Sequence, residues 1–202
     1  MTDRLTKQLE QLSKSLGADL FGVAPVERYV EAGAPAHMRP DAFASRFAAA
    51  AAGLATIGWH GAPITSEFGV TQRFISVVTD AALAPSPGRE LTDPCEGCER
   101  PCVTACPVGA ISADECTTAG PHRWGALDGL RCDWAKKYGL VAAEGPGLMG
   151  QTTDIAPPEG SVTAEKVMAA IEQKDPLQRR WTCVVERCLQ ACERRLDTGG
   201  RR

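Results

Sequence analysis

Four cysteines are gathered in the stretch Cys95-Glu-Gly-Cys98-Glu-Arg-Pro-Cys102-Val-Thr-Ala-Cys106-Pro107, around which the rest of the chain can be interpreted. Gaps of two, three and three residues separate the four thiols, and a proline follows the last one. A tight loop with this spacing can wrap three thiolates around one metal–sulfur cluster, while the fourth cysteine lies on the next turn and points away. The proline redirects the chain and removes a backbone donor. The stretch therefore predicts a metal centre with thiolate ligands.

The spacing is close to the bacterial ferredoxin run Cys-x2-Cys-x2-Cys-x3-Cys-Pro, with one extra residue in the middle gap. In that run the fourth cysteine ligates a second cluster, so further ligands must lie downstream. The chain supplies Cys132, and then Cys183, Cys188 and Cys192 with gaps of four and three residues. We therefore expect two [4Fe–4S] clusters. Crossed ligation assigns Cys95, Cys98, Cys102 and Cys192 to the first cluster. The second cluster takes Cys106, Cys132, Cys183 and Cys188.

Structural zinc is the main alternative for these thiols. The pair formed by Cys95 and Cys98 would suit a zinc ion, but zinc sites normally combine two short-spaced pairs. A four-cysteine run that ends in Cys-Pro favours clusters instead. Cys116 is left over from the two sets of four, and we expect it to be a buried, inert thiol. The exact pairing of cysteines with clusters stays open.

Length and charge limit the classes of protein to consider. The chain has 202 residues, which suffice for one compact domain or two small ones. With 22 basic and 25 acidic side chains the net charge is −3, so we expect no nucleic-acid partner. No apolar run is long enough for a membrane helix, and the polar start shows no secretory signal. We expect a cytoplasmic protein, in which nine cysteines serve metal or redox chemistry rather than disulfides.

The first half of the chain alternates helix and strand patterns. Leucines at 5, 9, 12 and 16 predict an amphipathic helix that ends at Gly17. The apolar run 20–24 predicts a buried strand, and the β-branched run 73–79 predicts another. Between them, Asp41 is expected to cap a helix that carries Phe43, Phe47, Ala51 and Leu54 on one side.

The second half differs in composition. Prolines and a glycine between residues 85 and 94 indicate a linker into the cysteine-rich part of the chain. Residues 144–162 are rich in Gly and Pro and predict a long loop, after which Thr163 is expected to cap a helix through Lys174.

Three stretches together resemble the epoxyqueuosine reductase and reductive dehalogenase group of corrinoid iron–sulfur enzymes. They are Leu20–Glu27, the segment from Ile57 to Asp80, and Cys95–Ile111 with the downstream cysteines. The resemblance implies a nitroreductase-like half that holds cobalamin, beside a double-cluster module that passes electrons to the cobalt. It also implies an organic substrate that the cobalt attacks or reduces, and it places His60 near the cofactor pocket.

The chain departs from that family in its first half. Only the loop 31–40 stands where the family carries a large insert with further strands and the catalytic acid, and no residue here matches that acid. The half is therefore short for a closed core, so a homodimer or a partner subunit is expected to complete it.

These observations combine into one expected architecture, of class α+β. A truncated nitroreductase-like α/β half, residues 1–84, packs on a ferredoxin-like double-cluster module, residues 85–202. The expected function is an oxidoreductase component that relays single electrons through two clusters to a corrinoid or a small organic substrate. The alternative is a ferredoxin-type carrier that serves a redox partner protein and has no substrate of its own. In a third interpretation the clusters only stabilise the fold.

Overall fold

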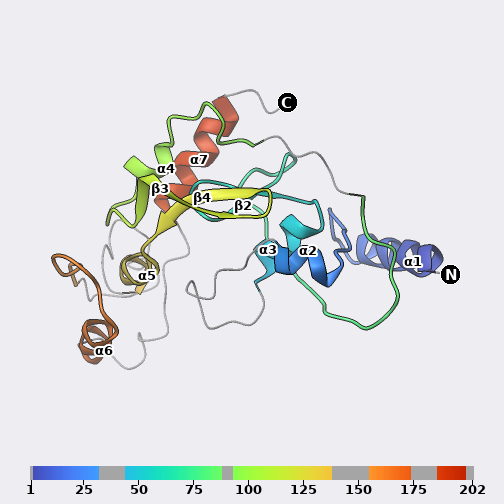
Figure 1. Ribbon diagram of the computed structural model, residues 1–202, viewed down its shortest axis with the longest axis horizontal. Coiled ribbons are helices and arrows are strands. Elements are labelled where there is room, and N and C mark those ends of the chain that lie inside the picture. The colour runs from blue at the N-terminus through green and yellow to red at the C-terminus, as the bar shows by residue number, and fades with distance from the viewer. Residues whose placement is uncertain (1, 32–43, 88–92, 138–154, 174–185, 199–202) are drawn as a thin grey trace. The chain divides into compact units, whose positions relative to one another are not determined.

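The computed structural model describes residues 2–31, 44–87, 93–137, 155–173 and 186–198 (Figure 1). The chain divides into two compact units. The first unit comprises Met1–Cys98 and Thr117–Trp124, and the second comprises Glu99–Cys116 and Gly125–Arg202. Helices and two small two-stranded sheets make up the described residues, so the predicted α+β class is confirmed. Within these residues no helix is both long and apolar enough to span a membrane.

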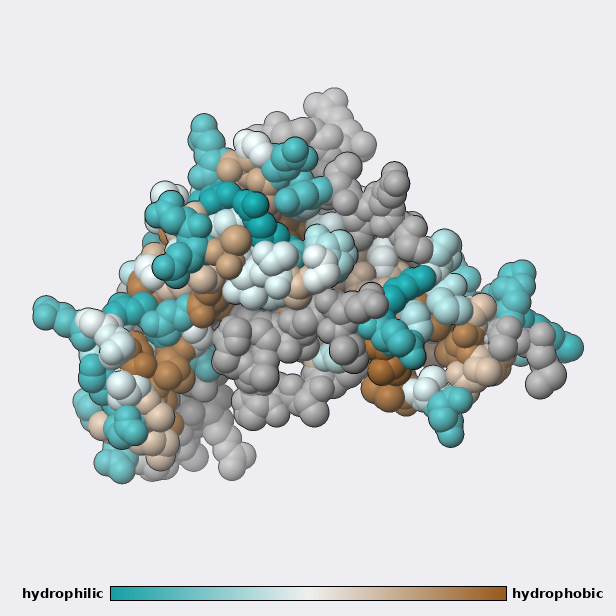
Figure 2. Space-filling view, in the orientation of Figure 1, coloured by the Kyte–Doolittle hydropathy of each residue, from teal (hydrophilic) through white to brown (hydrophobic). Residues whose placement is uncertain are grey.

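The first helix, α1 (Thr2–Ser15), follows the leucine repeat as predicted. Ion pairs of 2.8 Å join Lys7 to Asp3 and Lys14 to Glu10 along its polar side, each one turn apart. The helix ends at Gly17, whose φ of 94° is favourable for glycine, and Ala18 N donates back to a carbonyl of the last turn. The apolar side is largely exposed, and Figure 2 shows brown apolar surface over this helix between teal polar side chains.

The core of the first unit is built from small elements. They are α2 (Val26–Glu31), α3 (Ser45–Ala51), β1 (Thr56–Ile57) and β2 (Pro63–Ile64), and β1 pairs antiparallel with β2. Phe47 on α3 and Trp124 are each 1% exposed, and their rings lie 5.5 Å apart. The buried alanines of α3 allow the helix to pack closely on β1 and β2.

The helix expected after Asp41 begins later than predicted. Ala44 occupies the N-cap of α3, so Asp41 does not cap it. The N-cap has no side-chain hydrogen bond, and Ala44 N donates instead to the hydroxyl of Tyr29 on α2, at 2.8 Å. A contact between two helices thus replaces the local cap that the sequence suggested.

Neither of the two predicted longer strands forms. Residues 20–24 and 73–79 contain no strand. The first run is held instead by reciprocal bonds between Val23 and Ser86, both of 2.9 Å. A strand needs a neighbour to supply its ladder hydrogen bonds, and β-propensity alone does not create one. Among the described residues, neither run has such a neighbour.

The described residues of the second unit include most of a hairpin and form four helices. A two-stranded sheet forms from β3 (Ile111–Ala119) and β4 (His122–Leu127), whose connected ends belong to the first unit. The helices are α4 (Pro101–Thr104), α5 (Gly129–Lys137), α6 (Ala164–Glu172) and α7 (Arg187–Thr198). As predicted, Thr163 caps α6, because its side chain accepts from Lys166 N. In this unit α4 packs on α7, and α5 packs on α6.

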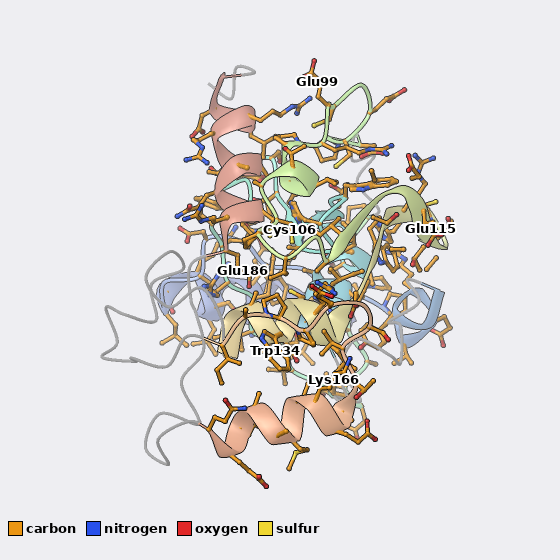
Figure 3. The ribbon with its side chains drawn as sticks, turned by 90° about the vertical axis from the view of Figure 1, so that its left-hand side faces the viewer. Glu99, Cys106, Glu115, Trp134, Lys166 and Glu186 are labelled. Carbon is orange, nitrogen blue, oxygen red and sulfur yellow. The ribbon has the colours of Figure 1, made fainter. Side chains whose placement is uncertain are left out.

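Two side chains of α5 hold the end of the predicted 144–162 loop. Arg131 donates to the carbonyls of Pro158 and Gly160 and also to Val108 O. Trp134 donates from Nε1 to Ile155 O at 2.8 Å and packs with Val162 and Ala170. Figure 3 shows Trp134 on α5 between Cys106 and α6. This part of the loop is therefore held by side chains of α5 rather than by a ladder of its own.

Candidate metal centre

The first two predicted ligands lie in a tight turn of the first unit. The carboxylate of Asp93 accepts from Cys95 N at 2.8 Å, and Cys98 N donates to Cys95 O at 3.2 Å. Between the two cysteines, Gly97 has φ 64°, a conformation that a residue with a Cβ rarely adopts. The Glu-Gly pair of the sequence thus forms the bend that separates the two thiols by one turn.

A backbone amide from β1 and β2 reaches this turn. Trp59, in the connection between those strands, donates its N–H to Cys95 Sγ at 3.1 Å. Hydrogen bonds to sulfur stabilise a thiolate and are one of the factors that set the potential of an iron–sulfur cluster. Arg123 covers the indole of Trp59, with its guanidinium carbon 5.3 Å from the ring centre. The connection therefore supports Cys95 from outside the run of cysteines.

The same connection contains His60, which the resemblance places near a cofactor pocket. The structure places His60 inside the connection, where it is only 7% exposed. Its Nδ1 accepts from Ala62 N at 3.0 Å, so the neutral ring carries its proton on Nε2. The ring lies against Gly58, whose added Cβ would meet His60 Cε1 at 3.0 Å. His60 therefore packs inside the β1–β2 connection, the same connection whose Trp59 amide bonds to Cys95.

In the second unit, Cys102 and Cys192 lie on two helices that pack together. Arg100 precedes α4 in the left-handed region with φ 54°, and its guanidinium donates to Ala113 O at 2.7 Å. Pro101 then opens the helix, where its fixed φ is favourable and its missing donor costs nothing. Cys102 on α4 and Cys192 on α7 are both buried, 4% and 9% exposed. Two ligands predicted for the first cluster are thus carried by one helix pair.

The loop after α4 wraps around Cys106. Ala110 N donates to Cys106 Sγ at 3.2 Å, and Gly109 N donates to Cys106 O at 3.2 Å. Gly109, with φ 60°, makes the turn that brings both amides back to the cysteine. Val108, Ala110 and Ala135 form an apolar cluster against which Cys106 and Cys132 pack. The thiol of Cys106 therefore has an amide donor on one side and apolar cover on another.

Cys106 and Cys132 lie close enough to Cys188 to act on its pKa. The pKa of Cys188 is raised from 9.0 to about 12, first because burial disfavours the thiolate. The carboxylate of Glu186 and the thiols of Cys132 and Cys106 raise it further. Such interactions require proximity, so three of the four ligands predicted for the second cluster gather in one region. Figure 3 shows Cys106 and Glu186 beside α5 on the side away from α6.

This region fits an iron–sulfur cluster by its donor set. Partly buried thiols that lie close together, with apolar cover and a backbone amide on sulfur, match the surroundings in which thiolates hold iron. Without metal, the Cys188 thiol keeps its proton at neutral pH. A metal bound through this thiol would have to displace that proton.

The predicted cysteine ligands are distributed over both units of the chain. Cys183 lies outside the described residues. Cys95 and Cys98 belong to the first unit, whereas Cys102, Cys106, Cys132, Cys188 and Cys192 belong to the second. Cys116 is exposed on β3, so the prediction of a buried thiol there was wrong. A hairpin with four consecutive exposed residues at 113–116 offers no interior for that side chain.

A single metal ion has no ready site among the described residues. In them, no group of three or more His, Cys, Asp or Glu side chains could hold one ion. An ion requires sulfurs about 2.3 Å from one centre. A cubane binds each thiolate through a different iron, so its ligands are spread around a larger body.

No protein-family model, curated protein or solved structure matches the chain.

The hydrogen-bond donors to the cysteine sulfurs were not predicted from the sequence, because Trp59 and Ala110 act through backbone amides that every residue except proline has. Only the nearby glycines at 58, 61 and 109 hinted at tight turns.

Proposed function

We propose that the chain is an iron–sulfur protein that binds two [4Fe–4S] clusters and relays single electrons through them. The observation that carries this proposal is the gathering of Cys106, Cys132 and Cys188, from three separate parts of the sequence, in one partly buried region. Three thiols gather in that region beside one carboxylate, that of Glu186, and a thiol-rich donor set favours iron–sulfur clusters over the oxygen-rich sites of hard cations.

The assignment of ligands follows the crossed scheme. The second cluster takes Cys106, Cys132 and Cys188, with Cys183 as its fourth ligand. The first cluster takes Cys102 and Cys192 from the packed pair α4 and α7, with Cys95 and Cys98. Because Cys102 and Cys106 are only four residues apart, the two clusters of this ferredoxin-like module would lie close together, which favours electron transfer between them.

Each cluster would supply one-electron oxidation and reduction, and the protein would tune it. The amides of Trp59 and Ala110 donate to Cys95 and Cys106, which favours the more negatively charged, reduced state. The apolar cluster of Val108, Ala110 and Ala135 keeps water from the second region. These groups act on the reduction potential of the clusters and on the access of water to them. Neither effect requires a bound substrate.

The destination of the electrons separates two versions of the proposal. In one, the chain is a reductase component that delivers them to a corrinoid or a small organic substrate near residues 57–80. In the other, it is a ferredoxin-type carrier for a redox partner protein. The engagement of His60 within the β1–β2 connection favours the carrier, because the histidine expected near a corrinoid already has a structural role there.

The test is anaerobic reconstitution followed by measurement of iron, acid-labile sulfide and the EPR spectrum of the reduced protein. The proposal predicts iron and sulfide in equal amounts, sufficient for two cubanes per chain, and spectra of two interacting clusters. Zinc uptake without sulfide would contradict it. Addition of cob(II)alamin then separates the two versions, because a change to the base-off cobalt signal would support the reductase and an unchanged signal the carrier.

A further inference from the structure

Residues 71–77 of the first unit show the side-chain alternation of a β-strand but do not belong to a sheet. From Thr71 to Val77 the side chains alternate strictly between exposed and half-buried. That period of two is what an extended backbone produces, since successive side chains point to opposite faces. Ile75 is 95% exposed and Val77 is 84% exposed, while Phe74 and Ser76 turn inward.

Within the described part of the chain, the backbone of this segment has no strand partner. Among the described residues, no backbone–backbone hydrogen bond involves positions 72–80. Such a row of amides and carbonyls is a template for another strand, and chains normally protect exposed edges with charges, prolines or bulges. Between its charged ends, Arg73 and Asp80, this edge carries the β-branched residues Ile75, Val77 and Val78, which pack well on a pleated surface.

We propose that residues 72–80 pair antiparallel with the same residues of a second copy, which gives a two-fold symmetric dimer with a continuous strand pair. This inference does not depend on the clusters. It assigns the missing strand neighbour of the first unit to the partner molecule.

The sequence of the segment is self-complementary in that arrangement. With Ser76 at the two-fold axis, Ile75 lies opposite the second copy's Val77, and the pair recurs by symmetry. The small serine leaves room where the two strands cross the axis. Apolar cross-strand pairs of this kind are the unit of sheet stabilisation.

The charges at the two ends favour the same orientation. Arg73 stands at one end of the segment and Asp80 at the other. Antiparallel pairing places the Arg73 end beside the second copy's Thr79–Asp80 end, so opposite charges lie at the same end of the strand pair, although residues 73 and 80 face opposite sides of it. Parallel pairing in register would place like charges beside each other on one face, which is unfavourable. The charges therefore favour the antiparallel orientation.

The test measures the mass of the full reconstituted chain by light scattering and sedimentation over a range of concentrations. Wild type should be a dimer. Ile75→Lys should raise the dissociation constant at least about tenfold, because each substitution acts at two symmetric pairs. Leu16→Lys is the matched control, since Leu16 is also exposed, at 79%, but lies directly after α1, and it should leave the mass unchanged.

An introduced charge pair tests the orientation. Ile75→Glu should weaken the dimer, because it places a carboxylate opposite the second copy's apolar Val77. The double variant Ile75→Glu with Val77→Lys should restore the affinity toward that of wild type, because the two introduced charges then lie opposite each other on one face, as this antiparallel register predicts. Failure of the second substitution to restore it would overturn the proposed register.

Hydrogen exchange of the unmodified protein gives an independent readout. Amides of residues 74–78 should become more protected as protein concentration rises. A monomer at every concentration, protection that does not depend on concentration, or a dimer insensitive to Ile75→Lys would each overturn the proposal. Iron content should be the same in all variants, so a failure of the cluster assignment would be seen separately.

Discussion

The amide of Trp59 donates a hydrogen bond to the sulfur of Cys95 over 3.1 Å. This bond joins the β1–β2 connection, buried in the core of the first unit, to the first cysteine of the run. Its consequence is that changes in the packing of the first unit should alter the surroundings of a bound cluster. The behaviour of variants in that connection can therefore be predicted from contacts some distance from any ligand.

Gly58→Ala should disturb both the fold and the first cluster. An added Cβ would lie 2.6 Å from Ile64 Cδ1, closer than side chains approach in practice, and 3.0 Å from His60 Cε1. Overpacking of this kind costs about 1–3 kcal/mol of unfolding free energy. We expect a lower thermal midpoint and a shifted EPR signal or potential of one cluster only.

The matched control is Gly129→Ala, since Gly129 opens α5 and a Cβ there meets nothing within 4 Å. We expect its stability to be unchanged or slightly raised, because alanine favours a helix over glycine. Equal stability losses in the two glycine variants would contradict the contact argument.

Substitution of single cysteines should divide them into two classes. Cys188→Ser and Cys132→Ser should each lose one cluster, about half of the iron, because their thiols lie in the same partly buried region as Cys106. Cys116→Ser should retain all of it, since that thiol is exposed on β3. Iron analysis and EPR of the three variants provide the measurement, and full iron in Cys188→Ser would refute the second-cluster assignment.

Arg131 should be important for stability through its donors. It bonds the carbonyls of Val108, Pro158 and Gly160, which attach two loops to α5. In Arg131→Met these carbonyls, of which those of Val108 and Pro158 are partly buried, lose a charged donor, which costs about 1.5–3 kcal/mol. Denaturant unfolding should show the loss, and hydrogen exchange should rise at residues 155–160. Arg131→Lys should recover only part of the stability, because one ammonium cannot replace the planar fork.

His122 should make the apo-protein sensitive to acid. Burial lowers its pKa from 6.5, because the charged ring is poorly hydrated on β4. A base with a lowered folded-state pKa binds fewer protons folded than unfolded, so its contribution to stability is present above 6.5 and is lost as pH falls below it. The thermal midpoint should therefore drop between pH 7 and 5, and less steeply in His122→Gln. An identical pH dependence in both proteins would contradict this.

Local chemistry was predictable from the sequence where it acts within one turn. The Thr163 cap and the glycine stop at Gly17 depend only on neighbouring residues, and both are present. The strand at 73–79 was not predictable in the same way, because a strand exists only beside another strand. For Cys116, an isolated thiol was assigned the burial typical of its residue type, but its place in an exposed part of the hairpin decides otherwise.

The candidate site also combines features that the sequence predicts with features that only the tertiary structure decides. Spacing nominated the eight ligands, yet spacing carries no information on which thiols meet in space. The proximity of Cys132 and Cys106 to Cys188 is a tertiary fact, and so is the burial that contributes most to the raised pKa of Cys188. The amide donors to sulfur come from backbone geometry at Trp59 and Ala110, which side-chain patterns do not reveal.

The most direct test of the central claim is the ratio of iron to acid-labile sulfide in the anaerobically reconstituted chain, measured with Mössbauer spectroscopy on ⁵⁷Fe-labelled protein. The account predicts equal iron and sulfide, enough for two cubanes per chain, and Mössbauer parameters of [4Fe–4S] clusters. Iron without sulfide, or cysteines filled by zinc alone, would contradict it.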